Sequence, residues 1–363
     1  GECSGDILAL MPAGVHSLAD EVAGSEPEVP DETAPLASHE PAARRSLPFG
    51  LTLTPTGSSL AGVATKTGSL DLLAAGRGME VVRGALADGE RLNMVPAEDG
   101  LCALEVCVVT SGVLTAPDDL GAVRLPPGSA ISADGLAQPV SFTADGDVTF
   151  LYITSRPQFQ AISRDLHELR RLAVDIEVTD GYTADHCERL QRLSYATGKE
   201  LGLDAGHLYN LDFGAYLHDV GKVRVPTEIL TKPGKLTDEE WVVIKRHPSF
   251  GREMLEPTFM RTAGTIVEQH HERLDGSGYP YGLAGDDVLI ESYIVAVADT
   301  YDAMTTDRPY RKGLPAQEAF DELERLQSVQ FPRDVVRAFR SAVLRVEHIP
   351  SAEAGRRGSA AAV

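Results

Sequence analysis

Five histidines and two aspartates stand in one apolar, helix-like stretch of this chain, and this set limits the possible folds more than any other feature. They are His186, His218, Asp219, His247, His270, His271 and Asp299. A buried carboxylate is costly unless a partner compensates it, and neutral imidazole is the commonest metal ligand in proteins. Each residue alone also has an ordinary explanation, as a surface or core side chain. Together they predict a helical domain built around a shared metal centre.

Length and charge limit the organisation of the chain and its partners. The 363 residues suggest two domains. The formal net charge of -21 argues against DNA, RNA or an anionic membrane as a partner. We find no apolar run long enough to span a bilayer and no basic secretory start, so we expect a cytoplasmic protein. Four scattered cysteines without a CxxC spacing fit a reducing compartment, and they are Cys3, Cys102, Cys107 and Cys187.

The amino-terminal part divides into two segments of different composition. Residues 1–46 are acidic and rich in proline, which predicts a flexible segment with one short helix over Asp6–Met11. Residues 47–155 carry short apolar stretches separated by turn signals about every dozen residues, which is typical of an all-β sandwich or barrel. We expect Cys102 and Cys107 to be small apolar side chains of this β-domain.

Two runs in the β-domain carry a family resemblance. The run Glu105–Leu114, followed by Leu125–Ile131, resembles a cupin barrel. Metal-binding cupins place histidines in these strands, but no histidine occurs here between His39 and His167. We therefore expect a regulatory domain, which senses a signal or dimerises, and not a metal-dependent cupin enzyme.

The sequence pattern of residues 156–180 predicts a connector helix between the two domains. Its apolar residues recur at spacings of 4, 3, 4 and 3, which form an a/d seam: Ile162, Leu166, Leu169, Ala173 and Ile176. Two heptads allow two interpretations, a coiled-coil homodimer or a helix packed on its own domain. The position between the two domains favours a connector that carries a signal, and we expect a homodimer through this helix.

Residues 181–351 predict an all-α domain. Thr237 begins a capping box that opens a helix holding Trp241, Ile244 and His247. A second helix has an apolar face with Asp299 one step off it, and that face consists of Ile290, Ile294, Val297, Ala298 and Tyr301. Residues 352–363 predict a disordered tail.

The helical domain also carries a family resemblance. In order and spacing it is similar to the HD-GYP subgroup of the HD-domain phosphohydrolases. The segments that carry it are His218–Lys222, His247-Pro248, His270–Glu272, Asp275–Pro280, Val297–Thr305 and Arg308–Arg311. The resemblance implies hydrolysis of cyclic di-GMP to pGpG, GMP or both. It also implies that the seven histidines and aspartates are metal ligands, with Asp219 as the bridge.

The resemblance further implies iron or manganese as the cofactor. Some family members hold a third metal through a glutamate four residues before the first histidine, and this chain has Tyr182 there. We therefore expect about two transition-metal ions per chain, which lower the pKa of a shared water and hold a phosphate.

Catalytic and substrate-binding roles follow for residues near the ligands. Asp219, His218 and Lys222 are the expected catalytic residues. Lys222 lies three residues after Asp219, so its side chain can enter the same site and neutralise phosphate charge. The alternative for Lys222 is an ordinary surface lysine. Substrate contacts are expected from Lys222, Gly278, Tyr279, Pro280, Arg308 and Arg311. Glycines allow close backbone approach, and guanidinium groups suit phosphates and guanine edges. Tyr279 could instead pack its loop, and both arginines could form surface ion pairs.

Two other functions remain open. The chain could bind cyclic di-GMP without catalysis and pass the signal to a partner, or it could hydrolyse another nucleotide. Loss of metal ligands is the usual mark of a non-catalytic relative, and none is lost here, which favours catalysis. The Gly278-Tyr279-Pro280 turn and the Arg308–Arg311 run favour cyclic di-GMP over another nucleotide.

Overall fold

The computed structural model describes residues 8–11, 45–46, 52–55, 58–65, 68–94, 96, 103–117, 120–179, 185–307 and 312–347. Several predictions concern residues outside these ranges. They are those for Cys3, Cys102, Tyr182, Arg308 and Arg311, for most of residues 1–46, and for the tail 352–363.

The chain divides into two compact units. The first comprises residues 1–137 and 141–163, and the second comprises residues 138–140 and 164–363.

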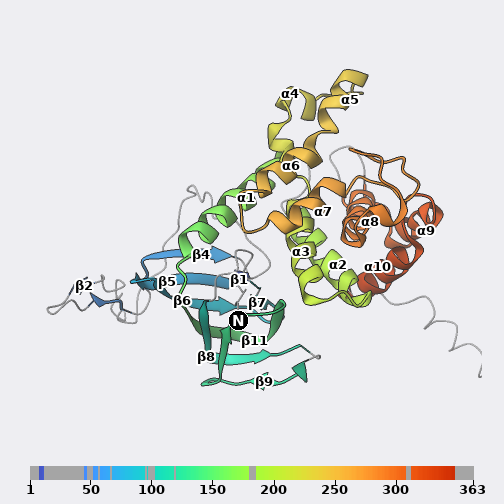
Figure 1. Cartoon of the computed structure of the whole chain (residues 1–363). Coiled ribbons are helices and arrows are strands. Elements are labelled where there is room, and N and C mark those ends of the chain that lie inside the picture. Colours follow the sequence, from blue (N-terminus) through green and yellow to red (C-terminus); the bar gives the residue numbers. More distant parts are fainter. Residues whose placement is uncertain are drawn as a thin grey trace, which may run out of the picture. The chain divides into compact units, whose positions relative to one another are not determined.

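The first unit is an antiparallel β-structure (Figure 1). Nine of its strands form one sheet, in which β1, β7, β11, β6, β5 and β4 are neighbours in that order, and β8 joins β11, β9 and β10. Strands β2 and β3 pair separately. The bounds are β1 Leu8–Met11, β2 Arg45–Ser46, β3 Thr52–Leu53, β4 Ala61–Thr65, β5 Gly68–Gly76, β6 Met79–Leu86, β7 Arg91–Met94, β8 Leu104–Thr115, β9 Arg124–Leu125, β10 Ala130–Asp134 and β11 Val140–Thr154.

Alternating burial explains why these segments are strands. Along β6 every second residue is buried, and Val82 and Leu86 lie in the core with Phe150 of β11 and Cys107 of β8. The prediction of an all-β amino-terminal domain is therefore confirmed at the level of an antiparallel sheet, and its cupin identity stays a prediction.

The prediction of a short helix over Asp6–Met11 is wrong for the residues of this segment that the structure describes. Leu8–Met11 form strand β1, which pairs antiparallel with Arg91–Met94 of β7. So short a segment is too brief to form a stable helix by itself, whereas the edge of β7 offers unpaired backbone groups. The sheet thus includes residues that precede the expected start of the β-domain at residue 47.

The second unit is helical. Its helices are α2 His186–Glu200, α3 Ala205–Leu217, α4 Thr227–Leu230, α5 Asp238–Ile244, α6 His247–Leu255, α7 Gly264–Gln269, α8 Ile290–Thr305, α9 Ala316–Leu326 and α10 Arg333–Val346. Short 3-10 turns are η3 Val220–Arg224, η4 Arg261–Ala263 and η5 Gly285–Asp287. Helix α8 is central, with Ile294, Val297 and Tyr301 buried in one cluster with Leu190 of α2 and Phe339 of α10. The prediction of a helical carboxy-terminal domain is confirmed.

Helix α1, Phe159–Thr179, occupies the position of the predicted connector. Of its seam, Leu166, Leu169, Ala173 and Ile176 are at most 6% exposed. The guanidinium of Arg170 lies 4.5 Å from the centre of the Tyr216 ring in α3, which places this part of α1 on its own helical unit. This is the second of the two interpretations of the seam, and homodimerisation stays a prediction.

The helix predicted to hold Trp241, Ile244 and His247 is two helices. Thr237 does form the capping box: its hydroxyl accepts from the Glu240 amide, and the Glu240 carboxylate accepts from the Thr237 amide. However, α5 ends at Ile244, and His247 is the first residue of α6. Pro248 follows at the start of α6, where its missing N–H costs no intrahelical hydrogen bond.

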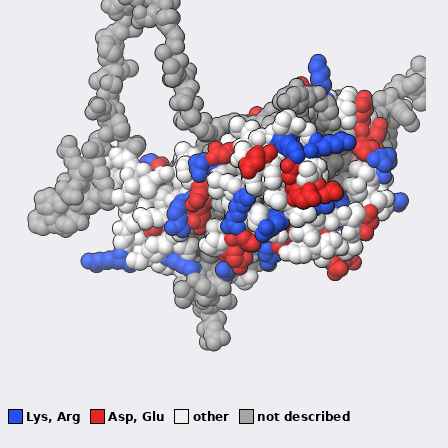
Figure 2. All heavy atoms as spheres, turned by 90° about the horizontal axis from the view of Figure 1, so that it is seen from above, with Lys and Arg blue, Asp and Glu red and all other residues white. Residues whose placement is uncertain are grey.

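Charged side chains of both signs lie on the face of the molecule that Figure 2 shows. On the face in Figure 2, basic and acidic groups stand side by side. Some are paired, as in Arg224 with Glu253 at 2.6 Å and Arg252 with Glu268 at 2.9 Å. Among the helices that the structure describes, none combines the length and apolar character needed to cross a bilayer.

Candidate metal centre

Helix ends position six of the seven predicted metal ligands, and Asp299 lies inside α8. His186 opens α2, His247 opens α6, and His218 and His270 directly follow the last residues of α3 and α7. Within the described residues they form two groups in which the candidate ligand atoms lie within 4.8 Å of one another. One group is Asp219, His247, His270 and His271, and the other is His186, His218 and Asp299.

Three of these histidines are oriented in the same way. The Nδ1 atoms of His218, His247 and His270 donate to the carbonyl oxygens of the residues three positions earlier, at 2.9, 2.8 and 2.6 Å. A carbonyl oxygen only accepts, so Nδ1 carries the proton and Nε2 keeps its lone pair. Those three Nε2 atoms are buried and make no hydrogen bond.

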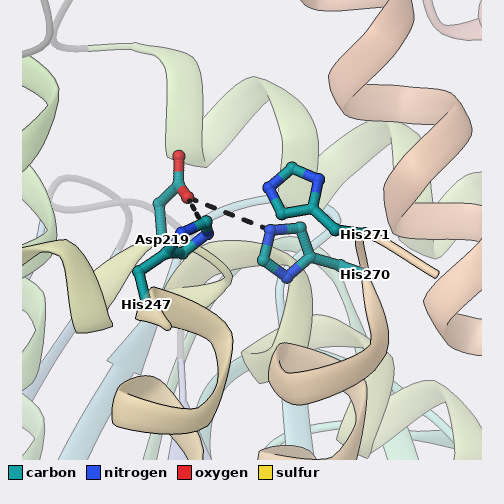
Figure 3. Close-up of side chains that lie close together, drawn as sticks. All are labelled: Asp219, His247, His270 and His271. Atoms are coloured by element: carbon teal, nitrogen blue, oxygen red, sulfur yellow. Dashed lines mark ion pairs between the residues drawn. The ribbon is translucent and has the colours of Figure 1, made fainter. Parts of the chain in front are cut away.

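Asp219 lies where the three Nε2 atoms converge, and Figure 3 shows it beside His247 and His270. Its Oδ1 is 3.1 Å from Nε2 of His247 and 3.9 Å from Nε2 of His270. Its Oδ2 is 3.3 Å from Nε2 of His218, which belongs to the other group. One carboxylate oxygen thus faces each group, which is the geometry expected of a bridging ligand.

His186 is held by an acidic residue that the sequence analysis did not assign. Its Nδ1 lies 2.7 Å from Oδ2 of Asp302, and its Nε2 lies 4.0 Å from Oδ1 of Asp299. Asp302 is 1% exposed and also pairs with Arg189 at 2.8 Å. A carboxylate behind a histidine fixes the ring and makes the far nitrogen a better ligand.

The electrostatics of the site favour bound cations. Burial, together with His218 and His247, lowers the pKa of His270 well below its ordinary value, so this ring is neutral. Burial alone would raise the pKa of Asp219, but Lys222 and His218 outweigh it and hold that pKa well below the usual range. Burial would likewise lower the pKa of His218, yet Asp219 raises it to about 9. The carboxylate thus attracts either a proton or a metal to His218.

The predicted substrate residues fall into three cases. Lys222 Nζ lies 2.7 Å from Oδ2 of Asp219, inside the site. The Tyr279 ring stacks on His271 with a centroid distance of 4.6 Å, so one face of Tyr279 packs on a candidate ligand. Pro280 follows Tyr279 in the same turn. Arg308 and Arg311, as stated above, lie outside the described residues.

Close contacts hold the Gly278–Pro280 turn over the histidines. A Cβ atom on Gly278 would lie 2.5 Å from Cα of Glu272 and from the carbonyl oxygen of His271. Glu272, 1% exposed, accepts from the amides of Tyr281 and Leu283 at 2.7 and 3.0 Å. The turn therefore needs glycine for close approach, and a buried glutamate fixes the segment that follows it.

The side chains present fit a pair of metal ions. Buried nitrogen lone pairs without hydrogen bonds face a buried carboxylate, which is an expensive arrangement without a cation. Imidazole and carboxylate ligands suit iron, manganese or zinc better than magnesium, which prefers oxygen ligands.

Sequence reasoning missed Asp302 and Glu272 as supports of the site. Both lie inside the quoted motifs, and both are buried acids, but their partners are distant in sequence. His186 is 116 residues from Asp302, so no local spacing connects them. The available signal was the position of Asp302 one helical turn after Asp299, on the same side of α8.

Comparison with known proteins agrees with the geometry. A family model described as an HD domain matches residues 175–335. The cyclic di-GMP phosphodiesterase response regulator RpfG of Xanthomonas campestris is 43% identical over 152 residues, 41% of this chain and 40% of the relative. A cyclic di-GMP phosphodiesterase of Thermotoga maritima is 41% identical over 166 residues, 45% of each chain.

A third relative has a different named substrate. The 3'3'-cGAMP-specific phosphodiesterase 3 of Vibrio cholerae is 34% identical over 150 residues, 41% of this chain and 33% of the relative. The chain thus spans less than half the length of each of these relatives. The likeness lies in the helical unit, whose residues 175–335 are similar to an HD domain and contain all seven candidate ligands.

Proposed function

We propose that this chain is a metal-dependent phosphodiesterase of the HD-GYP type, which hydrolyses cyclic di-GMP to pGpG, GMP or both. The observation that carries the proposal is the convergence of three buried Nε2 atoms on the two oxygens of Asp219. The identities of 43% and 41% to two cyclic di-GMP phosphodiesterases support the same reaction and substrate.

In this proposal each group of ligands holds one metal ion, iron or manganese. Asp219, His247, His270 and His271 would hold the first, His186, His218 and Asp299 would hold the second, and Asp219 would be shared by both. Two such ions together supply a strongly acidified water and neutralise a phosphate.

In this proposal the side chains of the protein position the metal-binding nitrogens and neutralise the charge of the phosphate. The i−3 carbonyls fix the tautomers of His218, His247 and His270, so three nitrogen lone pairs point inward without reorganisation. Lys222, beside Asp219, adds a positive charge where a phosphate oxygen would lie. The Tyr279 turn borders the site over His271 and offers a ring edge to a guanine base.

A cyclic dinucleotide of another kind is the second candidate substrate, because one relative at 34% identity is named as specific for 3'3'-cGAMP. The metal site would be the same in both cases, since both substrates contain the same phosphodiester linkage. Residues that contact the bases would distinguish them.

The test is product analysis with protein purified without oxygen and loaded with iron or manganese. Cyclic di-GMP and 3'3'-cGAMP are supplied separately, and products are separated by chromatography. Turnover of cyclic di-GMP to pGpG or GMP is expected. Tight binding without turnover by metal-loaded protein would favour the non-catalytic binding module, and a strong preference for 3'3'-cGAMP would favour the second substrate.

We further propose that the β-unit regulates the reaction through α1. The support is that α1 is one continuous helix, which begins in the first unit and continues into the second.

A further inference from the structure

The β-unit contains a small pocket that the proposed reaction does not use. It lies among β5, β6, β8, β11 and the start of α1, and it encloses a cavity of about 40 Å³. A water needs about 10–15 Å³ of such space, so the pocket has room for about three water-sized groups. Part of its wall is apolar and consists of Leu70, Val82, Phe159 and Ile162.

A row of polar residues crosses the floor of this pocket. Thr154 of β11 is directly opposite Glu80 of β6 on one side and Glu105 of β8 on the other. Directly paired residues in adjacent strands share a face of the sheet. All three are buried, so two carboxylates enter the same pocket on either side of a threonine.

Glu105 and Tyr152 leave polar atoms without partners. Glu105 is 6% exposed and Tyr152 is 2% exposed, and neither Oε2 of Glu105 nor the hydroxyl of Tyr152 makes a hydrogen bond. Burial raises the pKa of Glu105, and the neighbouring Tyr152 hydroxyl offsets that shift only in part. Unsatisfied buried acceptors are rare in folded proteins because each one costs free energy.

The other polar groups of the row already have partners. Glu80 accepts from the backbone amides of Gln158 and Phe159 at 2.8 and 2.9 Å, where α1 begins. The Thr154 hydroxyl accepts from the Arg156 amide at 3.0 Å. Glu80, Glu105 and Arg156 all line the pocket, so its lining carries one excess negative charge when the two carboxylates and the guanidinium are ionised.

These observations limit the chemistry of a ligand. It must donate hydrogen bonds to Glu105, carry a single positive charge and fit a small, partly apolar cavity. A metal ion fits poorly, because among the described residues the groups of three or more metal-binding side chains all lie in the helical unit.

We propose that this pocket binds a small primary ammonium ion, whose N–H groups donate to Glu105 and to the Tyr152 hydroxyl. Its short alkyl part lies against Leu70, Val82 and Phe159. Since Glu80 of the same row holds the first amides of α1, occupancy of the pocket acts directly on the amino-terminal end of that helix.

The test measures binding of ethylammonium to the full-length protein by isothermal titration calorimetry at fixed ionic strength. Ethanol and acetate serve as neutral and anionic probes of similar size, and magnesium serves as the metal probe. Saturable binding of ethylammonium alone is expected. Absence of saturable ethylammonium binding overturns the proposal, as does binding of acetate or magnesium in its place.

Two variants and a control assign the site. Glu105→Gln keeps the shape but removes the charge, and we expect its affinity to fall by about tenfold or more. Tyr152→Phe removes one hydroxyl and gives a smaller loss, and it replaces the first variant if that one does not fold. Asp147→Asn, at an exposed position of β11, is the matched control and keeps native affinity. Native affinity in both Glu105→Gln and Tyr152→Phe would place the ligand elsewhere.

The effect on catalysis rests on the proposed function and is measured separately, as the rate of cyclic di-GMP hydrolysis with and without ethylammonium. A change in rate that Glu105→Gln abolishes is expected. If the protein binds ethylammonium but hydrolyses no dinucleotide, the proposed function fails and the pocket proposal stands. If it hydrolyses cyclic di-GMP but does not bind ethylammonium, only the pocket proposal fails.

Discussion

At the scale of single residues, Asp219 is the carboxylate around which the other charged and polar groups of the site are arranged. Its two oxygens lie 3.1 Å from His247 and 3.3 Å from His218, and Lys222 supplies a nearby ammonium at 2.7 Å. Without Asp219, the imidazoles of His247, His270 and His271 would face one another with no carboxylate left in their group. The carboxylate is therefore needed for metal binding more than for folding.

Asp219→Ala is accordingly expected to abolish phosphodiesterase activity and to lower the bound metal while the helical unit stays folded. Activity, metal analysis and circular dichroism together check this. Asp287→Ala is the matched control, because Asp287 is exposed in η5 and belongs to neither ligand group. Normal turnover by a folded Asp219→Ala protein would exclude the two-metal mechanism.

Asp302 provides a second prediction, for a residue that positions a ligand. Asp302→Asn keeps the size of the side chain but weakens the hold on His186, so metal affinity should fall by about 10–100-fold. Titration of metal into the apoprotein measures this. Excess metal should restore the activity of Asp302→Asn, and failure of rescue with normal metal content would show a different role.

At the scale of elements, glycines determine how closely the ligand-bearing helices approach. Gly221 lies in η3, directly after Asp219-Val220, and an added Cβ would overlap the carbonyl oxygen of His247 and the amide of Gly251. The close packing of η3 on α6 therefore places Asp219 beside His247.

Gly221→Ala should force η3 away from α6 and destabilise the fold by about 1–3 kcal/mol, as overpacked cores do. Metal binding should weaken as well, because the distance between Asp219 and His247 would increase. Chemical denaturation and metal titration measure the two effects. Gly264→Ala is the control, since its added Cβ would lie 3.4 Å from the nearest atom, an ordinary contact. Equal stability and metal affinity in Gly221→Ala and the native protein would contradict this account.

The same scale shows what the sequence could and could not predict. Apolar periodicity predicted α8, turn signals predicted the all-β domain, and the family resemblance implied the seven residues that lie in the two groups. Local patterns failed where distant partners decide the structure, as at Leu8–Met11, which pair with β7, and at Asp302, which holds His186. The break between α5 and α6 was visible in Pro248, but the capping box at Thr237 suggested a longer helix.

At the scale of the whole molecule, the number of ligand groups predicts the metal content. The described residues hold two groups, so we expect about two iron or manganese ions per chain in protein purified without oxygen. Elemental analysis against protein concentration checks this. Three tightly bound ions per chain would contradict it and would point to a further ligand beyond these two groups.

The division into two units predicts how truncated proteins behave. A fragment of residues 157–363 keeps all of α1, whose Leu166, Leu169, Ala173 and Ile176 are buried. It also keeps Glu177, which accepts from the Cys187 amide at the start of α2, next to His186. We therefore expect this fragment to fold, bind metal and hydrolyse cyclic di-GMP at an altered rate.

A fragment of residues 180–363 should behave differently, because it lacks α1. Ala173 and Ile176, which lie beside His186 and Tyr216, would be missing, and the Cys187 amide would lose its acceptor. Metal content and hydrolysis of the two fragments are compared with those of the full chain. If the longer fragment folds and binds metal but hydrolyses nothing under any condition, the β-unit must contribute directly to the active site. If the shorter fragment is as stable and active as the longer one, α1 is a linker and does not support the metal centre.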